Sequence, residues 1–285
     1  MHPSRNKYGC ITIILWEASM AKKNGIQALP PECDSRLARA VDEVRFLKAR
    51  ELVLSERALS GGIGTLSEKT LHKTLKYYIE PNDRHHEVEY LGSVLDIKGE
   101  NGIFEIQTRG YEKLLPKLKK LLLTDRVTVV CPLAHVKAIR WIDEESGEIT
   151  PPRKSNKREN IYDALKMLFG IREVITNERL SIRVMYLDVE DFRSLNGYGK
   201  DRKHYSTRIE RIPNKILAEL LISNPDDYKL LLPQELPDEF VASELARAIK
   251  RTSRYTFYVL KLLVATGTIT ECGKRGRAQL YKKCK

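Results

Sequence analysis

The sequence predicts an α/β protein in which helices flank a mixed β-sheet, with a smaller helical unit at the C-terminus. Three observations carry this prediction. Residues 85–109 contain three short strand patterns separated by turn residues, helical patterns stand before and after them, and a continuous apolar run follows at 127–131. Such a run is typical of a strand that is buried on both faces of a sheet.

The three strands are expected at 87–91, 93–97 and 103–108, where they form a meander. Gly92 permits the first reversal of the chain. The sequence Gly-Glu-Asn-Gly at 99–102 supplies the second, because Gly and Asn adopt positive φ at little cost.

Two carboxylates are expected to meet in this meander. Side chains alternate across a strand, so Glu105 and Gln107 point to one face while Phe104 and Ile106 point to the other. Asp96 stands near the end of the preceding strand, where strand twist brings it beside Glu105. A pair of this kind suits a hard divalent cation. The alternative is two solvated acids on the edge of a strand pair.

A helix is predicted to open at 65–68, after Gly61, Gly62 and Gly64 interrupt the chain. Glu68 has two explanations that stay open: it completes a capping box with Thr65, or it assists the acidic pair. His72 is expected at the edge of the core rather than as a metal ligand. The face predicted to be buried consists of Leu71, Leu75, Tyr78 and Ile79.

A second amphipathic helix is predicted at 111–123, followed by the apolar strand at 127–131. The side chains expected to face outward are Lys113, Lys117 and Lys120, and those expected to face inward are Leu114, Leu115, Leu118, Leu121 and Leu122. The predicted order is therefore helix, three strands, helix, strand.

This order, with Asp96 on the second strand and Glu105-Ile106-Gln107 on the third, resembles the core of the PD-(D/E)XK nuclease superfamily. The resemblance spans residues 66–131. It implies a restriction-endonuclease-like fold in which Asp96 and Glu105 hold Mg²⁺ or Mn²⁺, the carbonyl of Ile106 adds a ligand, and Glu68 assists. Together with Gln107, the three acids are the implied catalytic residues.

The sequence departs from the superfamily at Gln107, where a lysine is usual. A lysine orients the attacking water and offsets charge on the phosphate, whereas a neutral amide only forms hydrogen bonds. Lys76, Lys98 or Arg109 is expected to supply the missing cation.

Four regions are expected along the chain: an N-terminal extension at 1–60 with a charged helix at 34–59, the nuclease-like domain at 61–195, a basic linker at 196–212, and a C-terminal domain at 213–285. Within the second region, a strand is expected at 137–142, a long polar loop at 143–160, a helix at 161–175 and a strand at 181–187.

The C-terminal domain resembles a winged helix-turn-helix. A helix at 214–222 is expected first, then helices at 241–249 and 253–265 separated by a tight turn, then a basic β-ribbon at 268–281. The resemblance implies that the last helix enters the major groove of DNA and that the ribbon forms the wing. The residues expected to contact DNA are Arg251, Ser253, Arg254, Thr256, Tyr258, Lys274, Arg275 and Arg277, and those expected in the core are Leu245, Ile249, Phe257, Leu260, Leu263 and Val264.

Positive charge is concentrated in this domain. The whole chain has a formal net charge of +12, and between residues 241 and 285 eleven Lys or Arg face two Glu, an excess of nine. A polyanion is the natural partner of such a segment, because neutralising phosphates releases condensed counterions. Double-stranded DNA is the expected partner, and a purely solubilising tail or a protein-binding winged helix is the alternative.

Composition favours a soluble globular protein of about two domains. No run approaches the roughly 20 apolar residues of a membrane helix. The apolar run at 11–16 is too short for a convincing signal peptide. Five scattered cysteines without a CxxC pair favour a reducing cytoplasm. The charged helix at 34–59 is expected to be a packing element or a contact in a homodimer.

The function expected from these features is a metal-dependent DNA endonuclease that is anchored on DNA by its C-terminal domain. The alternative is a DNA-binding regulator with an inactive nuclease-like domain, which Gln107 favours. RNA processing by the same acidic pair stays open, because phosphodiester chemistry does not itself select the sugar.

Overall fold

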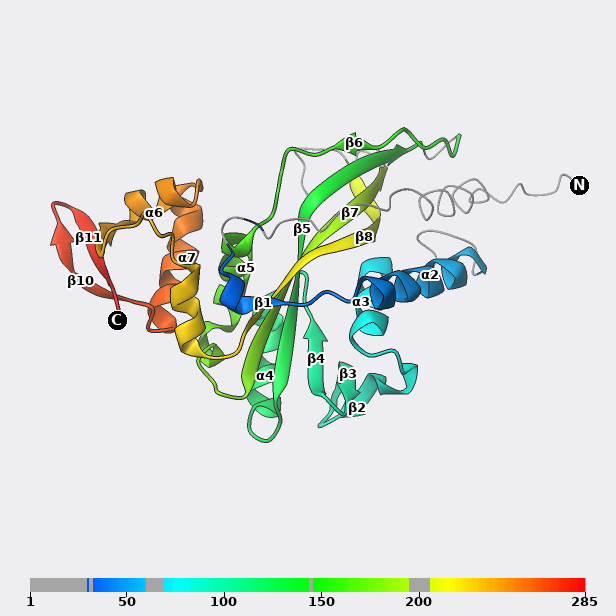
Figure 1. The fold of residues 1–285 in the computed structure, drawn as a ribbon, viewed down its shortest axis with the longest axis horizontal. Coiled ribbons are helices and arrows are strands. Elements are labelled where there is room, and N and C mark those ends of the chain that lie inside the picture. Colours follow the sequence, from blue (N-terminus) through cyan, green and yellow to red (C-terminus); the bar gives the residue numbers. More distant parts are fainter. Residues whose placement is uncertain (1–29, 31–32, 60–68, 144–145, 195–205, 285) are drawn as a thin grey trace, which may run out of the picture.

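A computed structural model describes residues 30, 33–59, 69–143, 146–194 and 206–284 (Figure 1). Its main feature is an eight-stranded mixed sheet with strand order β1-β8-β7-β5-β4-β3-β2 and with β6 paired to β5. A second, three-stranded sheet with order β10-β11-β9 lies near the C-terminus. The predicted α/β class is therefore confirmed. The predictions for the apolar run at 11–16, for Thr65 and for Glu68 lie outside the described residues.

The meander is present close to where the sequence predicts it. Its strands are β2 (His86–Tyr90), β3 (Ser93–Gly99) and β4 (Gly102–Ile106), and both pairings are antiparallel. Gly92 has φ +71° and Gly102 has φ +102°, so both turns use the left-handed backbone that glycine adopts without strain. The last strand ends at Ile106, one residue before Gln107.

The predicted order of helix, three strands, helix and strand is also confirmed. Helix α3 (Thr70–Ile79) precedes the meander, and α4 (Tyr111–Leu121) crosses over to β5 (Val127–Ile142), which runs parallel to β4. The predicted face of α3 is buried, and of the leucines predicted to face inward at 111–123, Leu114, Leu118, Leu121 and Leu122 are buried and Leu115 is half-buried. These apolar stripes fix each helix against the sheet.

The strands at the centre of the sheet are much longer than expected. The two strands predicted at 127–131 and 137–142 are one 16-residue strand, β5, with an irregularity between Ala134 and Val136. Strand β7 (Leu180–Ser194) runs parallel to it, and β8 (Thr207–Ile222) runs antiparallel to β7.

Strand β8 corrects two predictions. The part of the expected linker from 207 to 212 is in the sheet, and the helix expected at 214–222 is a strand. The local sequence Lys-Ile-Leu-Ala-Glu-Leu-Leu has good helix formers, but pairing along the whole of β7 overrides that weak preference. The strand signal is the alternation of its buried residues: Ile216, Ala218, Leu220 and Ile222.

The N-terminal helix is also shorter than predicted. Helix α2 spans Glu43–Leu59, and before it the chain forms a 3-10 turn (Ser35–Leu37) and strand β1 (Ala38–Arg39), which pairs with β8. Of the apolar residues in the predicted helix, Leu37 is buried and Val41 is partly buried, whereas Val44, Leu47 and Leu52 are exposed. Helix α2 buries Phe46, Ala49, Arg50, Val53, Leu54 and Arg57.

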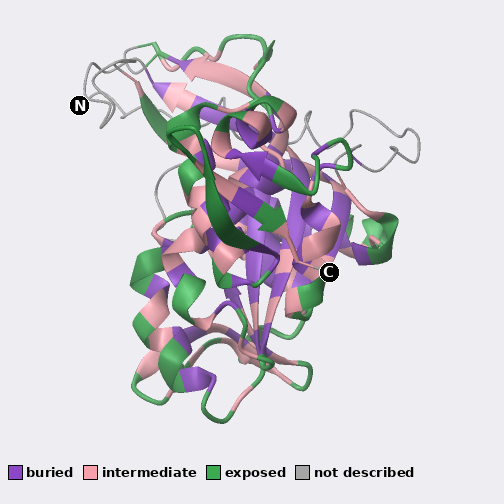
Figure 2. Ribbon diagram, turned by 90° about the vertical axis from the view of Figure 1, so that its left-hand side faces the viewer, coloured by how far each residue is buried: buried purple, intermediate pink, exposed green. Residues whose placement is uncertain are grey.

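The helices form two layers on the central sheet. Helices α2 and α3 pack with Met185, Leu187 and Ile216 on one face. Helix α4 and α5 (Ile161–Leu168), with the 3-10 helix Phe169–Val174, pack in the larger core on the other face. The helix predicted at 161–175 is thus confirmed. Figure 2 shows buried residues concentrated along the sheet between these layers.

The C-terminal unit contains the two predicted helices and the predicted hairpin. After the 3-10 helix Pro225–Leu231 come β9 (Glu239–Val241), α6 (Ala242–Ala248), α7 (Ser253–Ala265), β10 (Ile269–Arg275) and β11 (Ala278–Lys283). Helix α7 packs against α5, and its leucines share one core with those of α5. The unit is therefore joined to the large sheet by an apolar contact (Figure 1).

Candidate functional site

Strands β3 and β4 separate at the acidic pair. Their paired register runs from Gly99 and Gly102 to Ile97 and Phe104. At the next position, side chains take over the hydrogen bonds: Ile106 N donates to Asp96 Oδ2 at 2.7 Å, and Asp96 N donates to Glu105 Oε1 at 3.4 Å. Each carboxylate thus accepts a hydrogen bond from the backbone of the partner strand at this opening, and the negative charge of Asp96 acts on Glu105.

Glu105 is almost completely buried and has a cation beside it. Its residue exposure is 3%, and Lys117 Nζ of α4 lies 2.6 Å from its Oε1. Burial, followed by the negative charge of Asp96, raises the pKa of Glu105 to about 7, although Lys117 acts in the opposite direction. This carboxyl group therefore changes its protonation near neutral pH.

Asp96 has a different environment. Its Oδ2 lies 3.1 Å from His72 Nε2, in addition to its bond from Ile106 N. Burial acts to raise the pKa of Asp96, but the hydrogen bonds and the positive charge of Lys117 outweigh it, so the pKa is lowered. Two adjacent carboxyl groups with pKa values pushed apart are typical of acid–base and metal chemistry.

Gln107 does not join the acidic pair. Its Nε2 donates to the backbone carbonyl oxygens of Arg109 at 2.5 Å and Gly110 at 3.3 Å. The backbone carbonyl of Gln107 accepts a hydrogen bond from Tyr111 Oη at 2.6 Å. The side chain thereby closes the turn that leads into α4. Because the amide nitrogen already donates to two backbone carbonyls, it is poorly placed to orient a reacting water.

The basic side chain beside Glu105 is Lys117, which was not among the three candidates that the sequence suggested. Lys76 is bound to Glu87 at 2.9 Å, and Lys98 lies 4.7 Å from the centre of the Tyr90 ring. Lys117 was expected to face outward, and that prediction was wrong. The helical periodicity could have indicated this position. At 3.6 residues per turn, Lys117 lies closer to the buried stripe of Leu114, Leu118 and Leu121 than Lys113 or Lys120 does.

The oxygen-rich donor set fits a hard cation. Among the described residues, no group of three or more His, Cys, Asp and Glu side chains gathers as a ready ligand cage. Magnesium, however, is commonly held by one or two carboxylates with waters and substrate phosphates completing its shell. Asp96 and Glu105 offer that number of carboxylates. Of the other implied ligands, Ile106 contributes its N–H to Asp96, and Glu68 lies outside the described residues.

Three of the residues expected to contact DNA face the protein interior. Arg251 Nη2 lies 2.7 Å from Asp163 Oδ2 at the start of α5, and the Tyr258 ring packs edge-to-face on Phe169 with centroids 5.3 Å apart. Thr256 is fully buried, and its hydroxyl donates to a backbone carbonyl of its own helix. These three residues hold the C-terminal unit together or against α5.

The other five expected contacts are exposed: Ser253, Arg254, Lys274, Arg275 and Arg277. Arg275 Nη1 lies 2.9 Å from Glu244 Oε1. Phe257, expected in the core, is 51% exposed, because it is on the side of α7 away from the core residues Val259, Leu260 and Leu263.

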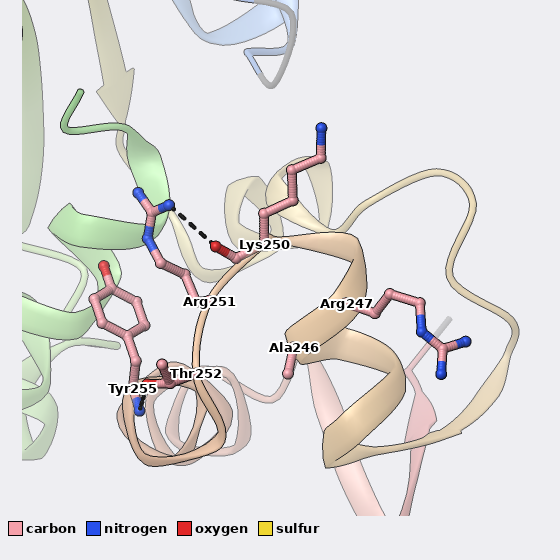
Figure 3. Close-up of a pocket in the computed structure, with 6 residues that line it drawn as sticks. All are labelled: Ala246, Arg247, Lys250, Arg251, Thr252 and Tyr255. Carbon is pink, nitrogen blue, oxygen red and sulfur yellow. Dashed lines mark hydrogen bonds between the residues drawn. The ribbon is translucent and has the colours of Figure 1, made fainter. Parts of the chain in front are cut away.

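A shallow hollow of about 410 Å³ lies at the turn between α6 and α7 (Figure 3). In Figure 3, Arg251 and Tyr255 are on one side of it and Arg247 is on the other. Arg251 donates to Asn160 Oδ1 at 3.3 Å as well as to Asp163 Oδ2, so its side chain is held against the start of α5. Its complete lining is Ala246, Arg247, Lys250, Arg251, Thr252 and Tyr255.

Fold and site together define an α/β protein with a long mixed sheet and an acidic pair where two of its strands separate. The chain belongs to the family described as Domain of unknown function (DUF8091), whose model matches residues 69–223, more than half of the chain. That match contains Asp96, Glu105 and Lys117 and ends before the C-terminal unit.

An uncharacterized protein of Treponema pallidum (strain Nichols) is 31% identical to this chain over 222 residues, which are 78% of this chain and 87% of that protein. The comparison with solved structures found no significant match. Among the described residues, no helix has both the length and the apolar character needed to cross a membrane.

Proposed function

We propose that this protein is a metal-dependent nuclease that hydrolyses phosphodiester bonds of DNA. The observation that supports the proposal is that Asp96 and Glu105 lie where β3 and β4 separate, with one oxygen of each already held by a protein donor. The order of α3, the meander, α4 and the parallel strand β5 supports it, because this is the order expected of the PD-(D/E)XK superfamily.

In this proposal each side chain has a distinct role. Asp96, whose pKa is lowered, stays ionised at neutral pH and holds the cation together with Glu105. A bound Mg²⁺ or Mn²⁺ would lower the pKa of a water and neutralise charge on the scissile phosphate. Lys117 takes the role expected of the lysine that Gln107 replaces, because its ammonium lies 2.6 Å from Glu105 Oε1.

The C-terminal unit serves as the DNA anchor in this proposal, as a winged helix. Its elements β9, α6, α7, β10 and β11 support the assignment, as does the excess of nine positive charges at 241–285. Arg254, Lys274 and Arg277 are exposed and contact the phosphate backbone. Arg251, Thr256 and Tyr258 instead have structural contacts.

The test is cleavage of supercoiled plasmid, linear duplex and RNA with Mg²⁺, Mn²⁺ or a chelator. Asp96→Asn and Glu105→Gln are expected to lower the cleavage rate by about 100-fold or more. Glu100→Gln is the matched control, because Glu100 is exposed on the β3–β4 turn of the same meander. Cleavage that persists unchanged in Asp96→Asn and Glu105→Gln would remove the proposed site.

A DNA-binding regulator is the second candidate, and the contacts of Gln107 favour it. Gln107 is engaged in the turn before α4, and Lys117 already neutralises Glu105 without a metal ion. On this proposal the protein cleaves nothing under any metal condition. Its duplex binding is salt-sensitive and is weakened by Arg254→Ala and Lys274→Ala.

A further inference from the structure

A cluster of basic side chains lies on the long central strands, apart from the acidic pair. It consists of Lys137 on β5, Arg193 on β7, and Arg208 and Arg211 on β8, and is called here the basic cluster. Strand pairing brings these positions together, because Lys137 is opposite Val189, Arg193 is opposite Arg208, and Arg211 is opposite Asp191.

Asp191 is the acid at the centre of the basic cluster. It is fully buried, and Arg211 binds it through Nε at 2.5 Å and Nη2 at 2.9 Å. Arg193 Nη2 lies 3.7 Å from its Oδ2. Burial acts to raise the pKa of Asp191, but the bonds from Arg211 and the nearby positive charges lower it, so Asp191 is ionised.

One carboxylate does not balance the positive charge of the basic cluster. Lys137 is 8% exposed, and Arg208 is exposed. Burial lowers the pKa of Lys137. Arg193 Nε is buried without a partner in the described part of the chain. Buried donors normally have a hydrogen-bond partner, so this nitrogen is available to an acceptor.

The imbalance points to an anion that completes the basic cluster. Among the described residues, the acids that act on its members are Asp191 and Glu159, so four basic side chains face two carboxylates and two positive charges remain in this part of the chain. Guanidinium groups present fork-shaped donors that match phosphate oxygens, and a lysine adds a compact charge. This donor set is that of a phosphate site.

We propose that Lys137, Arg193, Arg208 and Arg211 form a binding site for a phosphate group. The positive charge of Arg109, which follows β4 by three residues, also acts on Arg208. The phosphate belongs to a nucleic-acid strand or to a free phosphate compound. The inference does not require that Asp96 and Glu105 cleave the strand.

The test uses the full chain in chelator, so that binding is measured without cleavage. Affinity for a fluorescein-labelled duplex and single strand is followed by anisotropy over a range of salt, and thermal unfolding is followed with inorganic phosphate and pyrophosphate. The variants are Lys137→Met and Arg208→Ala. Arg126→Ala is the matched control, because Arg126 is exposed at the opposite end of β5.

If the phosphate belongs to a nucleic-acid strand, both variants should bind the strand about tenfold more weakly, and the salt slope of strand binding should fall by about one. Arg126→Ala should bind like the parent. A free phosphate compound predicts stabilisation by phosphate or pyrophosphate that both variants lose, with strand binding unaffected. Folded variants that bind strands and phosphates like the parent would overturn the proposal. Absence of cleavage with intact strand binding would count only against the nuclease.

Discussion

Lys117 Nζ lies 2.6 Å from Glu105 Oε1, which joins the middle of α4 to the strand that carries the acidic pair. The same ammonium donates to the carbonyl of Val94 on β3 at 2.6 Å. One lysine thus links the two strands at the point where their own hydrogen bonding ends. The cation at the acidic pair therefore comes from the crossover helix and not from position 107.

Replacing Lys117 with Met is expected to change the pH dependence of cleavage. Lys117 lowers the pKa of Glu105, so its removal raises that pKa above about 7. The rise in cleavage rate with pH should move to higher pH by about one unit. Lys113→Met, on the exposed side of the same helix, should keep the parent profile. An unshifted profile for Lys117→Met would show that this contact does not control Glu105.

Glu105 is also expected to make the folded state less stable as pH rises. Its pKa goes from an ordinary 4.5 to about 7 on folding, so the folded protein binds this proton more tightly than the unfolded chain. The free energy of unfolding therefore falls between about pH 4.5 and pH 7, by on the order of 3 kcal/mol, and this contribution is level above that range.

Glu105→Gln isolates that effect, because glutamine does not titrate. Urea unfolding of both proteins in chelator at pH 5 and pH 8 should show a smaller loss of stability in the variant. Contributions from the histidines are common to both proteins and cancel in the difference. Equal losses in the two proteins would mean that Glu105 titrates near its ordinary pKa in the folded state.

The sequence predicts the meander and the acidic pair because both depend on local signals. Turn glycines set the ends of the strands, and the alternation of Phe104, Glu105 and Ile106 sets the faces. Asp96 and Glu105 stand directly next to the last paired residues of β3 and β4, Ile97 and Phe104. The two helices and hairpin of the C-terminal unit are predictable for the same reason, because each has its own periodic pattern.

The parts that were not predicted depend on contacts between distant segments. Strand β8 has a local preference for helix, and only its pairing with β7 makes it a strand. The basic cluster arises from that same pairing, so its members are unremarkable in sequence. Likewise, the exposure of Arg251 cannot be judged without knowing that α7 packs on α5.

Arg251→Ala is expected to weaken the attachment of the C-terminal unit rather than a contact with DNA. It would leave Asp163 partly buried without the bond of 2.7 Å, which should cost about 1.5–3 kcal/mol of stability. Arg254→Ala, on the exposed side of α7, should change stability by less than about 0.5 kcal/mol. Urea unfolding measures both.

The same two variants should separate in DNA binding. Arg254→Ala is expected to lower the salt slope of duplex binding by about one, while Arg251→Ala keeps the parent slope at temperatures where it is folded. The reverse result would show that Arg251 leaves Asp163 to contact DNA.

Glu219 on β8 offers a test of how the sheet holds α3. It is fully buried in the sheet, accepts a hydrogen bond from Tyr78 Oη at 2.5 Å, and pairs with Arg183 Nη2 at 2.5 Å. Tyr78→Phe removes one donor from a carboxylate that keeps Arg183, so it should cost about 1 kcal/mol. Glu219→Ala leaves Arg183 unpaired beside the core and should cost about 3–5 kcal/mol.

In urea unfolding at neutral pH, the double variant should then be less destabilised than the two single changes predict together, because both remove the same hydrogen bond. Strictly additive losses would mean that α3 is held by its apolar face alone and that the buried bond contributes nothing.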